Sequence, residues 1–544
     1  MRSKRMNWRV IAVVTAVAAL LGCSSHHPPA PPQFVMLGLD AAAWKIALPL
    51  MRMGQLPAWQ RLVADGSCGS LGTLDPTVSV VIWTTIATGK LPEKHGITNW
   101  TAGANAEGDG QKAISSKQRT AAALWDMAKQ QNRTSLVFNW WATYPAEDIT
   151  GIMLTNRAFD QGLPRAVHPP ELAERIKQPV FSSRELAFPG GIGLPPAGQP
   201  IVEPPAFIAR RLGEDLIIAE LAQQLLTETK PAMSLIYFRT LDLLGHELWN
   251  DIEPEKLPDM PPEPPGRRGL ITRYYRFFDK YLAKIVDQAE PGLTIAITSD
   301  HGMEPKDHLP PPLEALNINK LLERVGLRQT RAQIGDVRGS VLAADAGIYP
   351  PGPLRALRIE GPADERAAVM ARVREVLSGL REESSGRPLF ENVTDGELPG
   401  EDLRLRIDLT LLPKDVVTGP SGPVKLGDVT DMIIHPRAGQ HWHAPAGVVT
   451  FAGPAIARGV KLEDARVEDI APTVTAVMGW PRALDFDGRV LAESLSAGAL
   501  PVWPQGEIPS YPRLRPVDGA PIAEEAGQDE ELLSELKSLG YIAQ

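Results

Sequence analysis

This chain has few cysteines, no excess of basic over acidic charge, and no long apolar segment beyond its amino terminus. Only Cys23 and Cys68 occur among 544 residues, so the core and any bound metal must supply the stability that disulfides give many small secreted domains. The net charge is -9, and without a basic surplus to displace phosphate counterions the chain does not fit a general nucleic-acid binder. No apolar run after residue 23 is long enough for a membrane-spanning helix.

The amino terminus has the pattern of an export signal. Several basic residues precede an uncharged stretch, Val10–Gly22, which is too short to span a bilayer. The segment Leu20–Cys23 is similar to the lipobox of bacterial lipoproteins. We therefore expect a signal peptide at 1–22, a lipid anchor on Cys23 and a tether at 23–32, with the protein held in the bacterial cell envelope at the periplasmic face of the outer membrane. An ordinary secretory peptide or hydrophobic anchor is the alternative.

Short apolar runs alternate with helical patterns along the rest of the chain. We expect strands at 33–39, 135–138 and 293–299, and helices at about 119–131 and 206–229. Strands that alternate with helices form parallel sheets, because a crossover helix returns the chain to the same edge. The sequence therefore predicts an α/β fold with a doubly wound, mostly parallel central sheet and helices on both faces.

Glycine (47) and proline (51) are plentiful, and they concentrate in segments that read as surface loops. We expect one catalytic domain over residues 33–500. An inserted cap-like subdomain at about 325–432, which shapes the substrate pocket, interrupts it. Residues 501–544 are expected to form a proline-rich tail with a short helix.

Acidic and imidazole side chains follow several of the predicted strands. Asp40 and the pair Asp300 and His301 each end an apolar run, and Asp242 lies just past another. In an open α/β sheet, functional sites form at the carboxyl ends of the strands. Carboxylates and imidazoles are ligands that zinc prefers. Their number suits two metal ions with a hydroxyl nucleophile between them.

Ser79 is the candidate nucleophile. It lies in the segment Asp75–Ile97, at the start of a helix predicted at about 80–88, where backbone amides and the helix dipole favour an anion. A serine hydroxyl is a poor nucleophile until a metal or a base removes its proton. The alternative is that Ser79 only caps the helix, and Thr77 and Thr84 are the competing hydroxyls.

Several motifs together resemble one family. In chain order they are Gly38–Asp40, the Ser79 segment, Thr143–Pro145, Asp242–Trp249, Thr298–Met303 and Asp469–Val474. Their types and order are similar to those of the type I phosphodiesterase/nucleotide pyrophosphatase family of the alkaline phosphatase superfamily. The resemblance extends from residue 33 to about residue 490.

The resemblance implies two divalent metal ions, with zinc as the default. One ion would be held by Asp40, Ser79, Asp300 and His301, and the other by Asp242, His246 and His443. The i, i+4 spacing of Asp242 and His246 puts both on one side of a helical turn. The family pattern places a ligand four residues before the glycine that opens the next strand, which selects His443, with His441 as the alternative.

The same resemblance implies a role for Asn99, whose amide would contact a phosphoryl oxygen; its alternative role is turn formation. The implied activity is hydrolysis of a small-molecule phosphate ester through a covalent phosphoseryl intermediate. A phosphomonoesterase, a phosphonate monoester hydrolase and a non-catalytic ligand-binding lipoprotein are the alternatives. A sulfatase is disfavoured, because Val81 and Trp83 occupy the places of its proline and arginine. No obligate protein partner is indicated.

Overall fold

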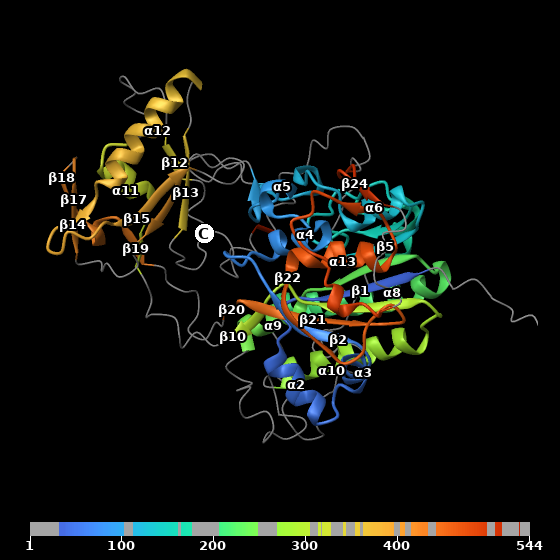
Figure 1. Ribbon diagram of the computed structural model, residues 1–544. Coiled ribbons are helices and arrows are strands. Elements are labelled where there is room, and N and C mark those ends of the chain that lie inside the picture. The colour runs from blue at the N-terminus through green and yellow to red at the C-terminus, as the bar shows by residue number, and fades with distance from the viewer. Residues whose placement is uncertain are drawn as a thin grey trace, which may run out of the picture.

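The computed structural model of the protein (Figure 1) describes residues 32–102, 112–160, 165–176, 206–248, 269–304, 314–316, 318–327, 341–343, 354–359, 363–395, 403–407, 415–420, 422–432, 442–497, 506–513 and 532–533. The predicted signal peptide, Cys23, His441 and most of the predicted tail lie outside these residues. None of the described helices is both long and apolar enough to cross a membrane.

A nine-stranded sheet forms the centre of the molecule. Five of its neighbouring strand pairs are parallel and three are antiparallel, which confirms the prediction of a mostly parallel sheet. In spatial order its strands are β22 (Val460–Arg466), β2 (Ser67–Gly72), β21 (Ala446–Ala452), β9 (Leu293–Thr298), β1 (Gln33–Leu39), β8 (Met233–Phe238), β5 (Ser135–Phe138), β6 (Gly151–Leu154) and β7 (Val167–His168).

The three central strands, β9, β1 and β8, are buried along almost their whole length. Their sequences are nearly continuous apolar runs, as expected where helices cover both faces of a parallel sheet. Figure 1 shows this layering. One face carries α4 (Ser79–Thr88), α5 (Pro92–His95), α6 (Leu124–Gln130) and α13 (Ile470–Val477). The other carries α2 (Trp44–Arg52), α3 (Pro57–Asp65), α8 (Ala206–Thr229), α9 (Thr240–Leu248) and α10 (Gly269–Asp287).

Strand β21 runs antiparallel to β9, with Val449 opposite Thr298 and Ala452 opposite Ile295. Its amino end therefore lies beside the carboxyl ends of β9 and its parallel neighbours. A short ribbon just before it, in which β20 (Trp442–Ala444) pairs with β10 (Gly302–Glu304), lies at the same edge. The reversed strand thus brings the 442–444 segment to the edge where Asp40 and Asp300 lie.

A second hydrophobic core is built from residues between Leu321 and Val429, and none of its members belongs to the core of the main sheet. In Figure 1 its elements lie to one side of that sheet. They are α11 (Ile318–Arg324), α12 (Ala363–Ser378), the sheet of β12 (Val341–Ala343), β13 (Leu354–Ile359), β16 (Leu403–Ile407) and β15 (Phe390–Asp395), and the sheet of β14 (Arg381–Glu382), β17 (Val416–Gly419) and β18 (Gly422–Lys425).

The first and last strands of this region pair with each other. β11 (Glu314–Leu316) and β19 (Thr430–Met432) form an antiparallel ribbon in which Glu314 faces Met432 and Leu316 faces Thr430. The chain therefore enters and leaves the second core at one place. Two further ribbons join β3 (Thr101–Ala102) to β4 (Lys112–Ala113) and β23 (Arg482–Ala483) to β24 (Glu507–Ile508). Short 3-10 helices cover Ser116–Gln118, Pro170–Ile176, Leu426–Asp428, Val467–Asp469 and Ala492–Ser494.

Most predicted elements are confirmed, including the strand at 33–39 and the helix at 206–229. The helix expected at about 119–131 begins only at Leu124. The reason is Arg119, which is extended and almost fully buried, and which forms ion pairs with Asp126 and Glu147. Burying a guanidinium requires such partners, and reaching both keeps residue 119 out of the helix.

Candidate metal centre

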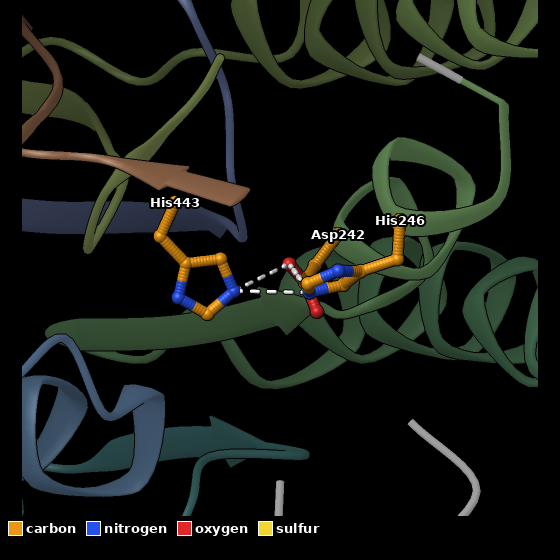
Figure 2. Close-up of side chains that lie close together, drawn as sticks. All are labelled: Asp242, His246 and His443. Atoms are coloured by element: carbon orange, nitrogen blue, oxygen red, sulfur yellow. Dashed lines mark hydrogen bonds and ion pairs between the residues drawn. The ribbon is translucent and has the colours of Figure 1, made fainter. Parts of the chain in front are cut away.

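Three buried side chains converge on one point at the carboxyl edge of the sheet (Figure 2). Asp242 and His246 come from α9, and His443 comes from β20. His246 Nε2 lies 3.0 Å from His443 Nε2. Asp242 Oδ1 lies 3.3 Å from the first nitrogen and 3.4 Å from the second. Two imidazole nitrogens and a carboxylate oxygen facing one another are a donor set that binds zinc.

A second group of buried side chains surrounds His301. Its Nε2 lies 3.4 Å from Asp40 Oδ1, 3.3 Å from Asp300 Oδ2 and 3.2 Å from Ser79 Oγ. Within the described part of the chain, Asp40 Oδ1 and Asp300 Oδ2 have no hydrogen-bond partner. Buried carboxylate oxygens normally accept hydrogen bonds, so two without one in the same cradle are suited to a cation.

The two groups are adjacent. The rings of His301 and His443 stack with their centroids 3.7 Å apart. One ligand atom each from Asp40, Asp242 and His301 lie within 4.8 Å of one another. This compactness suits the separation of about 3.5–4 Å between ions in two-metal sites. The structure thus brings together all seven residues that the sequence predicts as ligands.

The partners of the ring nitrogens indicate which ones can bind a metal. His301 Nδ1 lies 2.9 Å from Gly302 O, and His443 Nδ1 lies 3.4 Å from Thr77 O. A carbonyl oxygen only accepts, so these Nδ1 atoms carry the hydrogen and each Nε2 presents a lone pair. Both lone pairs then face carboxylate oxygens. Several acceptor atoms that face one another in this way fit a divalent cation. The hydrogen bond from Nδ1 to a carbonyl oxygen is typical of histidines that bind metals through Nε2.

Burial dominates the electrostatics of the site. It raises the pKa of Asp300 to about 7. Burial, with the neighbouring Asp300 and Asp242 carboxylates, also raises the pKa of Asp40 well above its usual range. Burial acts in the same direction on Asp242, but its interactions with the His246 imidazole bring its pKa well below the usual range. Burial lowers the pKa of His443 to about 3, which keeps that imidazole neutral. Carboxylates crowded in this way favour a cation between them.

Ser79 is the first residue of α4 and is buried. Val78, not Ser79, occupies the N-cap position, and no side chain caps this helix. The Ser79 hydroxyl faces His301 Nε2 at 3.2 Å instead. The competing hydroxyls have local partners, since Thr84 Oγ1 donates to Val80 O and Thr77 Oγ1 donates to Leu74 O. The geometry therefore favours Ser79 over both.

Asn99 and His95 have local partners. Asn99 Oδ1 accepts a hydrogen bond from the backbone N–H of Trp100, 2.7 Å away, as expected of an asparagine that forms a turn. His95 is fully buried: its Nδ1 accepts from the backbone N–H of Ile97, and its Nε2 lies 3.0 Å from Thr85 Oγ1. The contact with Thr85 joins α5 to α4, and His95 lies outside the two clusters.

Two other buried residues next to the clusters were not predicted from the sequence. Tyr237, near the end of β8, donates a hydrogen bond from its hydroxyl to Asp40 Oδ2. Asp215, on α8, accepts hydrogen bonds from the backbone N–H groups of Arg239 and Thr240 at the start of α9. Each contact joins residues that are far apart in sequence. No local pattern distinguishes Tyr237 or Asp215 from the other buried residues of their elements.

Comparison with known proteins identifies the family. The family described as type I phosphodiesterase / nucleotide pyrophosphatase matches residues 34–418. No curated protein matches the chain. A structure of phosphonoacetate hydrolase from Sinorhizobium meliloti 1021 with phosphonoformate is 16% identical, with a TM-score of 0.46, over 81% of this chain and 94% of that one. Human ectonucleotide pyrophosphatase / phosphodiesterase 5 is 14% identical, with a TM-score of 0.43, over 86% of this chain and 100% of the other.

The family match spans well over half of the chain and includes all the candidate ligands except His443. The buried carboxylate and imidazole clusters have the composition that a divalent metal requires. The protein therefore belongs to the type I phosphodiesterase/nucleotide pyrophosphatase family, and it is a phosphoester hydrolase.

Proposed function

We propose that this protein is a two-metal phosphodiesterase that acts through a covalent phosphoserine at Ser79. The observation that carries the proposal is the position of Ser79 Oγ, 3.2 Å from His301 Nε2, beside two clusters of buried ligand atoms. Asp40, Ser79, Asp300 and His301 would hold one ion; Asp242, His246 and His443 would hold the other. Zinc suits this mixture of imidazole and carboxylate. When bound, the ions supply positive charge that acidifies the serine hydroxyl and neutralises the phosphoryl oxygens.

The position of Ser79 suits an in-line displacement. Ser79 Oγ gives up its proton to solvent and forms a bond to phosphorus while the bond to the departing oxygen breaks, and that oxygen takes a proton from solvent. A water molecule then attacks the phosphoserine and leaves its hydroxyl on phosphorus. The bond between Oγ and phosphorus breaks, and one proton of that water passes to Ser79 Oγ. The products are an alcohol and a phosphate monoester, with retention at phosphorus. Because Ser79 begins a buried helix, its backbone holds the hydroxyl in place and the helix dipole favours the anionic group.

The choice between a diester and a monoester substrate depends on the walls of the pocket. A comparison of chromogenic diester, monoester and phosphonate monoester substrates separates the proposal from its alternatives. Preference for the diester supports the proposal, and preference for either of the others replaces it. We further propose that the export signal and Cys23 place the activity at the cell envelope, outside the cytoplasm.

Replacement of the nucleophile tests the mechanism directly. Ser79→Ala should lower turnover of the diester by roughly 10³-fold or more, because it removes the hydroxyl that forms the covalent intermediate. Its metal content should stay near that of the unmodified protein, since Asp40, Asp300 and His301 remain. Rapid acid quenching with a 32P-labelled substrate should trap phosphate on the unmodified protein and none on the variant.

Thr84→Val is the matched control. Thr84 is buried on the same helix, and its hydroxyl donates a hydrogen bond to the backbone carbonyl of Val80. This change should leave turnover within a few-fold of the original. Full activity in Ser79→Ala would remove Ser79 from the mechanism, and loss of metal from both variants would show that α4 itself had been disturbed.

A further inference from the structure

The two carboxylate oxygens of Asp40 have different surroundings. Oδ2 accepts a hydrogen bond from the Tyr237 hydroxyl. Oδ1 lies 3.4 Å from His301 Nε2, and no hydrogen-bond partner for it exists among the described residues. The side chain is therefore held by one oxygen and presents the other to the cluster around His301.

Tyr237 is itself held in one orientation. The indole Nε1 of Trp141 lies 2.8 Å from the Tyr237 hydroxyl oxygen and can only donate to it. The single hydrogen of that hydroxyl is then directed to Asp40, so the chain of bonds runs from Trp141 through Tyr237 to Asp40. The Arg239 guanidinium lies over the ring of Trp141, 4.5 Å from its centroid, and fixes the indole in turn.

The packing around Tyr237 supports the same orientation. Its ring contacts Trp83 and Trp140 edge-on, with centroids 4.9 and 6.2 Å away. Residue 38, on the neighbouring strand β1, is a glycine. A Cβ atom there would lie 2.8 Å from the Trp83 ring and 3.3 Å from the Tyr237 ring. The glycine two residues before Asp40 therefore allows these rings to approach β1, which brings the hydroxyl within reach of the carboxylate.

We propose that Tyr237 is a positioning residue for the metal ligand Asp40. The inference rests on the proposed function. By occupying Oδ2, the tyrosine hydroxyl keeps the carboxylate from rotating and leaves Oδ1 for the ion that Asp300 and His301 also hold. Hydrogen bonds of this kind to a ligand typically change metal affinity by about 10–100-fold. Tyr237 should therefore set the affinity of one of the two metal positions and leave the other unchanged.

Tyr237→Phe removes only the hydroxyl and is the variant of choice. Tyr281→Phe is the matched control, because Tyr281 is a buried tyrosine of the same core whose hydroxyl has no hydrogen-bond partner in the described structure. Zinc affinity is measured by competition with a chromogenic chelator, and bound zinc is counted by mass spectrometry of the dialysed protein. In Tyr237→Phe, one of the two zinc ions should bind about 10–100-fold more weakly. The turnover of this variant should recover as zinc is added, whereas a purely structural defect would not respond to zinc.

The proposal would be overturned if Tyr237→Phe and Tyr281→Phe bound zinc with equal affinity at both metal positions. It would also be overturned if Tyr237→Phe lost activity that excess zinc did not restore. If Tyr237→Phe fails to fold, Trp141→Phe carries the same test. It keeps an aromatic ring but removes the N–H that orients the tyrosine, so a several-fold loss at one equivalent is expected and no loss overturns the proposal. Failure of the proposed function would look different, since the unmodified protein would then bind fewer than two zinc ions or fail to hydrolyse the ester.

Discussion

At the scale of single residues, two buried histidines show that burial alone does not identify a ligand. Burial lowers the pKa of both His95 and His443 to about 3, so both imidazoles are neutral. Their surroundings differ. His95 bonds to the backbone of Ile97 and lies near the hydroxyl of Thr85, whereas His443 Nε2 faces a second imidazole and a carboxylate. The first set of partners satisfies a neutral ring, and the second needs a cation.

This difference predicts opposite results for two alanine variants. His443→Ala should lose about one equivalent of bound zinc and most of the activity, because it removes one of three donors at that position. His95→Ala should keep both equivalents. It should lower the free energy of unfolding by about 2–4 kcal/mol, since it leaves a cavity and a buried backbone N–H without its acceptor. The number of bound zinc ions and the free energy of unfolding by denaturant measure the two effects. Unchanged zinc content in His443→Ala would indicate that His441 is the ligand instead.

At the scale of secondary-structure elements, α9 connects the fold to the candidate metal centre, because it carries both Asp242 and His246. Its first backbone N–H groups are bonded by a side chain from another helix. Asp215 of α8 accepts from the N–H of Thr240 at 3.0 Å and of Arg239 at 3.4 Å, and also from the hydroxyl of Tyr274 on α10. This carboxylate therefore fixes where α9 begins and, with it, the direction in which the two ligands point.

Asp215→Ala should weaken both stability and metal binding. It leaves three buried donors without their acceptor, and each such donor costs roughly 1–3 kcal/mol. We expect a loss of several kcal/mol in the free energy of unfolding and weaker zinc binding at the Asp242 position. Denaturant unfolding in the presence of a chelator isolates the first effect, and chelator competition measures the second. Zinc affinity equal to that of the unmodified protein would show that α9 keeps its position without Asp215.

The same carboxylate gives a pH dependence of known sign. Burial raises the pKa of Asp215 to about 6, from an ordinary value of 3.8. The folded protein then holds this proton more tightly than the unfolded chain, so the contribution of Asp215 to stability falls as the pH rises from about 4 to about 6 and is constant above that. The fall is on the order of 3 kcal/mol.

Asp215→Asn should remove this pH dependence, because the amide does not titrate but can still accept from the Thr240 N–H. Unfolding of the metal-free unmodified protein and of the variant should be compared at several values between pH 4 and pH 7. The unmodified protein should lose stability relative to the variant as the pH rises. Two parallel curves would show that the Asp215 carboxylate titrates in the folded protein as it does in the unfolded chain.

At the scale of the whole molecule, the second core and the metal centre depend on different parts of the chain. The candidate ligands follow strands of the main sheet or lie on α4, α9 and the β10–β20 ribbon, whereas the second core is built between Leu321 and Val429. The β11–β19 ribbon joins the two ends of that region, with Leu316 opposite Thr430. We propose that this region is the inserted subdomain and acts on substrate choice, not on metal binding.

Replacing residues 317–429 with a short glycine- and asparagine-containing turn tests this division. Because Leu316 and Thr430 are already paired, a two- to four-residue turn can close the ribbon without moving either strand. The shortened protein should fold and bind the same number of zinc ions, while its relative rates on diester and monoester substrates change. Unchanged relative rates would remove the subdomain from substrate selection, and loss of zinc would show that the metal centre depends on it.

Much of this protein follows from local sequence pattern. Apolar runs predicted the central strands because a strand covered on both faces must be apolar throughout, and the i, i+4 spacing of Asp242 and His246 predicted a shared helical face because helix geometry is local. The family motifs predicted the ligands by type and order. Neither source predicted the late start of the helix at Leu124, since this depends on the partners of Arg119.

The sequence by itself determined most of the elements, their order and, through the family motifs, the candidate metal ligands. Only the tertiary structure decided how those residues are supported. The antiparallel course of β21 brings His443 to the edge where the parallel strands end, Tyr237 reaches Asp40 across 197 positions, and Asp215 reaches the start of α9 from another helix. Such contacts arise from packing between distant segments, and a single sequence carries no local periodicity that records them.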